Sequence, residues 1–266
     1  DYATAGVTSQ TLAFGNVHVG DTLGAQTLAV TNTLTAAAAA YQDSLSVTAT
    51  AAAGVTTSAI SELTAGSSAN LTFTADTSVA RSLAGNVTLS LTSTGTVSGL
   101  DSRALTTSAT FSTTGLVYSG QSVWNTNGNG SWGTFASGFG ANWGANQGSA
   151  GLDAAFAAVD TATFDNTALT AGDSATVSLN GAAPSLKTIA FSTTGGGYTI
   201  AAGTGGSLTL KSSVGSAGIN VGGGTHVVST AVALDSSVAA AITAGSIEFT
   251  GVLSGAGVLS KTGAGT

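Results

Sequence analysis

The stretch Gly251-Val-Leu-Ser-Gly-Ala-Gly-Val-Leu-Ser-Lys-Thr-Gly-Ala-Gly-Thr266 decides the fold of the second half of this chain. It alternates a short β-forming run with a turn of small residues, and it does so twice. A unit this short cannot bury its own apolar face, so it becomes stable only where similar units stack on it. The stretch therefore predicts a β-solenoid. Because the pattern breaks off at Thr266, we expect the last rung to be covered by further repeats or by another subunit.

Short apolar runs of the same kind recur upstream from about residue 175, at intervals of about ten to thirteen residues. Glycine-rich segments separate them, and we interpret these glycines as turns because a phosphate-binding loop would need a helix N-terminus after it. The interpretation predicts a right-handed solenoid over residues 173–266. The expected rungs are Thr176–Leu179, Leu186–Phe191, Tyr198–Ile200, Leu208–Leu210, Ile219–Val221, Val227–Val228, Val232–Leu234, Ala241–Ile242, Ile247–Phe249, Leu253 and Leu259.

Residues 1–118 show a different pattern, in which apolar and small polar residues alternate with period two. Clusters of Gly, Asn and Asp separate these runs at spacings typical of an all-β sandwich. The alanine run at 36–40 is too short to nucleate a helix, so we expect a loop there. The expected strands are Leu12–Phe14, Gln26–Asn32, Ser44–Thr48, Asn70–Thr74, Asn86–Thr92 and Leu105–Phe111.

The segment 119–172 holds all three tryptophans, Trp124, Trp132 and Trp143, among Asn and Gly residues. One interpretation is a linker and cap whose aromatic rings cover the first rung of the solenoid, which would otherwise expose an edge. The alternative is a platform on which sugar rings stack. Buried rings favour the cap and exposed, coplanar rings favour the platform.

Composition excludes several classes of function. Charged residues make up only 6% of the 266, against roughly a quarter in an average globular chain. The net charge is −7 and neither half has a basic patch, so we expect no nucleic acid partner. There is no apolar run long enough to span a membrane. The absence of cysteine suits a secreted β-solenoid exported as an extended chain, and we expect a location outside a Gram-negative-type bacterium.

Chemistry-bearing residues are sparse, and we expect no catalytic residues, no metal site and no cofactor. His18 and His226 are the only histidines and have no partners at metal-ligand spacing. Asp160, Asp165 and Asp173 allow a calcium site, but capping of turns by their side chains explains them as well. The solenoid half contains three lysines and no arginine, which argues against the acid and base clusters of carbohydrate-active β-helices.

Two resemblances accompany these patterns. Gly251 to Thr266 resembles the autotransporter-associated β-strand repeat, which occurs in bacterial autotransporter passengers and related large surface proteins. Leu12 to Thr33 contains a Phe-Gly-x-Val-x-Val-Gly segment followed by Leu-x-Val-x-Asn, and it resembles immunoglobulin-like domains of the choice-of-anchor or ASH type. The second resemblance implies a spacer or binding module in which Phe14 and Val17 fill the core.

Together these observations predict a non-catalytic structural protein of the bacterial cell surface or a biofilm matrix. We expect it to self-assemble as a homo-oligomer or head-to-tail fibre, through strand edges and through a solenoid end formed by Val258, Leu259, Lys261 and Thr266. The alternative is a monomeric autotransporter-type adhesin that binds surface glycans through its tryptophans.

Overall fold

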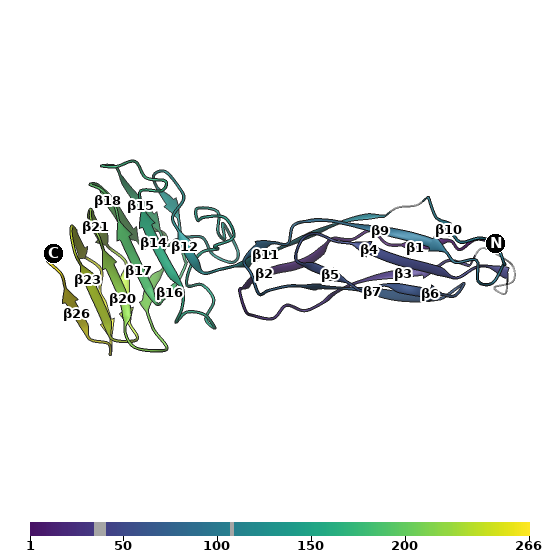
Figure 1. Cartoon of the computed structure of the whole chain (residues 1–266). Coiled ribbons are helices and arrows are strands. Elements are labelled where there is room, and N and C mark those ends of the chain that lie inside the picture. Colours follow the sequence, from purple (N-terminus) through teal and green to yellow (C-terminus); the bar gives the residue numbers. More distant parts are fainter. Residues whose placement is uncertain (35–40, 107–108) are drawn as a thin grey trace. The chain divides into compact units, whose positions relative to one another are not determined.

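The computed structural model describes residues 1–34, 41–106 and 109–266. The described residues form β-strands and no α-helix, as expected of an all-β chain. The chain divides into two compact units, which we call the antiparallel unit (Asp1–Val117) and the parallel unit (Tyr118–Thr266) (Figure 1). The alanine run at 36–40 and residues 107–108 of one expected strand lie outside the described residues.

The antiparallel unit contains two sheets, A and B. Sheet A has the strand order β1-β3-β7-β5, and sheet B has the order β2-β11-β9-β4-β6, with β8 paired to β11 and β10 paired to β9. The bounds in sheet A are β1 (Ala5–Val7), β3 (Gln26–Asn32), β5 (Val55–Thr57) and β7 (Ser68–Ala75). Those in sheet B are β2 (Leu12–His18), β4 (Leu45–Thr50), β6 (Ile60–Leu63), β8 (Arg81–Ser82), β9 (Gly85–Ser93), β10 (Arg103–Ala104) and β11 (Thr110–Tyr118).

The alternating pattern of the sequence builds the core of this unit. Leu28 and Val30 of sheet A and Val47 of sheet B are fully buried in one apolar cluster, while the residues between them point outward. Phe14 and Val17 are buried in the same cluster. Alternation with period two therefore places one face of each sheet against the other.

In the antiparallel unit a buried carboxylate, that of Asp43, binds the residues that follow β9. Asp43 has no exposed surface, and its Oδ1 accepts hydrogen bonds from the backbone N–H groups of Val97 and Ser98. Its Oδ2 accepts bonds from the hydroxyls of Ser98 and Ser93. Burial raises the pKa of Asp43, but the hydrogen bonds from Ser98 and Val97 outweigh burial and hold it below the usual value. These four hydrogen bonds to the Asp43 carboxylate hold the loop after β9 against the two sheets.

The parallel unit, all of which is described, contains three parallel sheets that we call P1, P2 and P3, and Figure 1 shows their strands stacked side by side. P1 consists of β12 (Gln121–Val123), β14 (Thr161–Asp165), β17 (Thr188–Ser192), β20 (Ala217–Val221), β23 (Val238–Ile242) and β26 (Leu259–Thr262). P2 consists of β13 (Gly130–Ser131), β15 (Ser174–Ser178), β18 (Gly197–Ala201), β21 (Thr225–Val228) and β24 (Ser246–Phe249). P3 consists of β16 (Ser185–Leu186), β19 (Ser207–Leu210), β22 (Ala231–Leu234) and β25 (Leu253–Gly255).

From β14 on, the chain visits P1, P2 and P3 in turn, whereas the first turn has β12 in P1 and β13 in P2 only. We call any three successive strands, one from each sheet, a coil. Each strand pairs in parallel with the strand of the same sheet in the next coil, an arrangement consistent with a β-helix. In the last coils the pairing advances by 21 residues, from Gly218 to Ala239 and from Ala239 to Ser260. The segment 119–172 contributes β12, β13 and β14, so parallel pairing begins upstream of residue 173.

Side chains of the same register stack into inward columns along the three sheets. In P1 one column runs through Phe164, Phe191, Val221 and Ile242, all buried. Because every second residue of each strand faces inward, a short apolar pair per strand is enough to fill the interior when coils stack.

Candidate functional site

The three tryptophans lie together at the start of the stack, against Phe164 of β14. Trp124 and Trp132 have no exposed surface and Trp143 is 3% exposed. The ring of Trp143 meets those of Trp124 and Trp132 edge to face, with centroids 5.3 and 4.8 Å apart. All three rings have centroids within 6.1 Å of the Phe164 ring. Buried rings in edge-to-face and tilted contacts make a packed aromatic cluster.

Two of the indole N–H groups bind buried backbone carbonyls. Trp132 Nε1 donates to the carbonyl of Ala150 at 3.0 Å, and Trp143 Nε1 donates to the carbonyl of Trp132 at 2.9 Å. Trp124 Nε1 is buried and has no acceptor among the described residues. None of the rings offers a face to a ligand. Stacking of sugars would require exposed rings, and these rings are buried. The geometry therefore favours the cap.

The residues around Trp143 also cover the edge of β12 that faces away from β14. Val123 points its backbone N–H and C=O away from β14; its N–H donates to Gln147 Oε1 at 2.7 Å and its carbonyl accepts from Gly144 N–H at 2.9 Å. Next to β12, Asn125 N–H donates to the Asn142 carbonyl, and Asn142 Nδ2 donates to the carbonyl of Ser131 in β13. We call residues 140–151 the cap segment. Strand addition at β12 would have to displace it.

The other end of the stack is formed by the last coil, residues 246–266, which holds β24, β25 and β26. Val258 and Leu259 are 67% and 40% exposed, and Val252 and Leu253 are also exposed. Leu259 continues the inward column of Ala217 and Val238. The last coil thus presents the continuation of the interior columns as an apolar face.

Lys261 and Thr266 make different contacts in the last coil. Lys261 stands in the inward column after Ala240, and its ammonium group donates to the Gly263 carbonyl at 3.0 Å. The backbone of Thr266 pairs with the start of the same coil at β24: its N–H donates to the Gly245 carbonyl, and its carbonyl accepts from the Ile247 N–H. Val258, Leu259 and Lys261 therefore lie on the exposed end, while the backbone of Thr266 is already paired to the stack.

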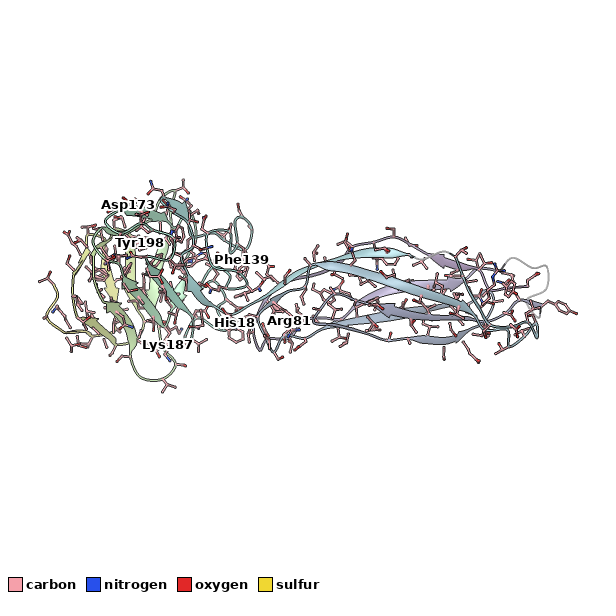
Figure 2. The ribbon with its side chains drawn as sticks, turned by 45° about the horizontal axis from the view of Figure 1, so that its top comes forward. His18, Arg81, Phe139, Asp173, Lys187 and Tyr198 are labelled. Atoms are coloured by element: carbon pink, nitrogen blue, oxygen red, sulfur yellow. The ribbon has the colours of Figure 1, made fainter. Side chains whose placement is uncertain are left out.

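The polar groups inside the stack serve structure. Tyr198 lies within the parallel unit (Figure 2), and its hydroxyl donates to the carbonyl of Asp165 at 2.8 Å. Burial, followed by the nearby Asp165 charge, raises the pKa of Tyr198 to about 12. His226 accepts the Tyr198 N–H at Nδ1 and binds the Gly223 carbonyl through Nε2. Burial lowers the pKa of His226, so the neutral tautomer with its proton on Nε2 fits both bonds.

The three aspartates weighed as calcium ligands make different contacts, and Asp173 accepts the Gly197 N–H through its backbone carbonyl. Asp160 is buried and its carboxylate accepts the Gly151 N–H, whereas Asp165 caps its own turn by accepting the Thr167 N–H. Within residues 1–34, 41–106 and 109–266, no group of three His, Asp or Glu side chains is placed to hold a metal ion. No helix of the described chain is long and apolar enough to cross a bilayer.

Comparison of the sequence with protein-family models and with curated proteins finds no match. The two resemblances therefore remain predictions. Sequence reasoning did not find Gln147, whose side chain caps β12, or Asp43, because each acts on a partner far along the chain. Gln147 stands in no recognisable motif, whereas Asp43 lies in the stretch Tyr41–Val47, which continues the immunoglobulin-like resemblance.

Proposed function

We propose that this chain is a non-catalytic structural protein of the bacterial cell surface or of an extracellular matrix. In this proposal an immunoglobulin-like β-sandwich carries a right-handed β-solenoid that gives length and stiffness with few charges. The composition supports an extracellular role, since 42% of residues are hydrophobic and only 6% are charged. The interior polar groups support a non-catalytic role, because Tyr198 and His226 are bound to the backbone.

One observation carries the proposal: the inward columns continue from coil to coil and reach the last coil as exposed apolar side chains. The column of Ala217 and Val238 is buried, but Leu259 at its continuation is 40% exposed. A further coil laid on this face would remove the apolar surface from water, which is the main gain in stacking repeats. Because Lys261 stands in an inward column, the covering coil must offer its ammonium group a carbonyl or carboxylate.

The cap segment limits how copies of the chain can associate. A head-to-tail fibre would require the last coil of one copy to pair with β12 of the next, but Val123 is already bonded to Gln147 and Gly144. We propose that the last coil is covered by further repeats of a longer chain or, where none follow, by the last coil of a second copy. A contact of like with like is isologous and closes as a dimer, so growth into a fibre needs a second contact through an edge strand of the sandwich.

Sedimentation velocity over a range of concentrations, with negative-stain imaging, tests the assembly. We expect species larger than the monomer, and we expect the double variant Val258→Asp, Leu259→Asp to return the protein to monomer. Val214→Asp is the matched control, because Val214 is an equally apolar side chain, 81% exposed, on a loop of the same unit. A chain that stays monomeric at every concentration, or a control that dissociates as the double variant does, would contradict assembly through the last coil.

A further inference from the structure

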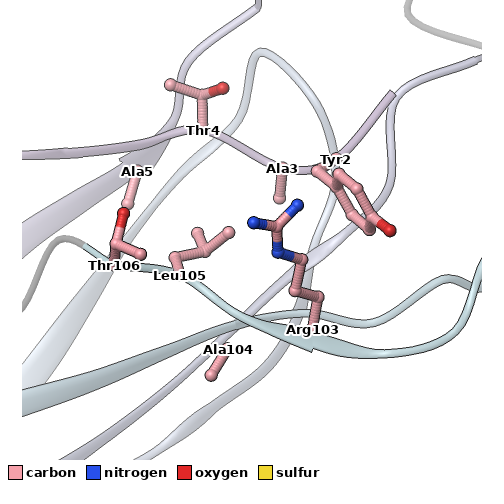
Figure 3. A pocket seen from close by; sticks show the side chains of 8 residues that line it. All are labelled: Tyr2, Ala3, Thr4, Ala5, Arg103, Ala104, Leu105 and Thr106. Atoms are coloured by element: carbon pink, nitrogen blue, oxygen red, sulfur yellow. The ribbon is translucent and has the colours of Figure 1, made fainter.

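A small pocket opens on the antiparallel unit between two edge strands, and its volume is about 200 Å³ (Figure 3). One wall is the segment that leads into β1 of sheet A, and the other is β10 with the residues that follow it. Among the described residues, β1 lies at the edge of sheet A and pairs with β3, and β10 pairs with β9 alone. The pocket therefore lies where the two sheets of the sandwich separate.

Arg103 supplies the charge of this pocket. Its guanidinium lies over the ring of Tyr2 at 5.0 Å from the centroid, and Figure 3 shows it reaching in between Tyr2 and Leu105. Arg103 is exposed, and a ring face accepts no hydrogen bond from the N–H groups at the guanidinium edge, which remain open to solvent or to a ligand. Arg81, the other arginine, forms an ion pair with Asp76 at 3.2 Å, whereas Arg103 has no carboxylate partner among the described residues.

The remaining lining limits the size and polarity of a ligand. Ala3 is buried and Leu105 is partly buried, so the floor beside the guanidinium is apolar. Thr4 and Thr106 add hydroxyl groups at the wall. The volume is below that of typical drug-sized sites, so only a small molecule or a single side chain fits.

We propose that this pocket binds a small carboxylate with a short apolar tail. The planar fork of an arginine pairs with a carboxylate through two parallel N–H···O bonds, and the apolar floor covers the tail. In a chain with a net charge of −7, an unpaired arginine beside an apolar hollow is the complement of an anion. The proposal does not depend on assembly through the last coil.

Titration of the ¹⁵N-labelled full chain with butyrate, followed by ¹H–¹⁵N correlation spectra, tests the proposal. We expect saturable shifts confined to the amides of residues 3–5 and 103–106. Butyramide, the neutral isostere, should give none, and inorganic phosphate should give weaker shifts because it has no apolar tail. Shifts of equal size with phosphate and butyrate would mean an adventitious anion only and would overturn the proposal.

Two arginine variants make the test specific. Arg103→Gln should lower the affinity for butyrate at least tenfold, while Arg81→Gln, which removes the other arginine of the unit, should leave it unchanged. Arg103→Lys keeps the positive charge but lacks the two parallel N–H donors of the guanidinium, so it should also bind butyrate more weakly. This variant provides the test if Arg103→Gln does not fold. Unchanged butyrate affinity in folded Arg103→Gln or Arg103→Lys would refute the assignment.

Discussion

The tryptophan cluster allows a sharp comparison between Trp132→Phe and Trp124→Phe. Both side chains are fully buried against Phe164, so both changes remove the same volume from the same cluster. They differ in their N–H groups. Trp132 Nε1 donates to the carbonyl of Ala150, whereas Trp124 Nε1 is buried and meets no acceptor in the described part of the chain.

The expected difference follows from those two donors. Trp132→Phe leaves the Ala150 carbonyl buried and unpaired, which costs about 1–3 kcal/mol beyond the lost packing. Trp124→Phe removes an orphan donor and so recovers part of its packing loss. We therefore expect Trp132→Phe to destabilise the parallel unit by about 2 kcal/mol more than Trp124→Phe. Trp132→Ala should cost more than either, about 3–5 kcal/mol.

The assay must resolve the two units, because a chain of two compact units need not unfold in a single step. Urea unfolding followed by hydrogen exchange, read on peptides from β14 and β15 and on peptides from β7 and β9, gives the stability of each unit. We expect the loss on the β14 and β15 peptides alone. Equal effects of the two Phe variants, or a cost below about 1 kcal/mol for Trp132→Ala, would refute a packed cap.

Three further predictions follow from buried contacts. Asp43→Asn should destabilise the antiparallel unit by about 2 kcal/mol or more. Folding lowers the pKa of Asp43, so the stability that its carboxylate contributes should be complete above the usual pKa of 3.8 and should decrease as the pH falls below that value. Urea unfolding midpoints measured against pH test both expectations. Folding also lowers the pKa of His226, so the parallel unit should lose stability as pH falls below 6.5, and His226→Phe should abolish this pH dependence in thermal melts. Gly197→Ala places a Cβ 1.7 Å from the Thr225 carbonyl and should cost at least about 2 kcal/mol, whereas Gly218→Ala meets only a side chain at 3.4 Å and should change the melting temperature little.

The sequence predicted the strands of the stack better than their grouping. The apolar pairs at Leu208–Leu210 and Val232–Leu234 fall in β19 and β22, and their spacing marks single strands. That three strands close a coil cannot be read from spacing, because each pair fits equally well at any position of a repeat. The run Leu186–Phe191 shows the limit, since it spans β16 and β17, which belong to different sheets.

The sequence could predict the tryptophan cluster but not the pocket beside Arg103, and the difference has a physical reason. Burial of the three tryptophans follows from their apolar surface, and the sequence could name the cap as one of two alternatives. The pocket beside Arg103 could not be foreseen, because Tyr2 and Arg103 are brought together only by the pairing of β1 with β3 and of β10 with β9. In the same way, Gln147 acts on Val123 through one side-chain contact that leaves no periodic signal.

The direction of the backbone hydrogen bonds has a mechanical consequence. In the parallel unit these bonds run from coil to coil, so a pull along the axis loads one coil boundary at a time. Each regular coil of 21 residues, the step from Ala239 to Ser260, would release a tether of about 70 Å when it detaches. In exchange, the stack shortens by only about 4.8 Å. Such a stack extends under load by yielding one coil at a time, in steps that range from 21 residues between Ala239 and Ser260 to 30 residues between Thr188 and Gly218.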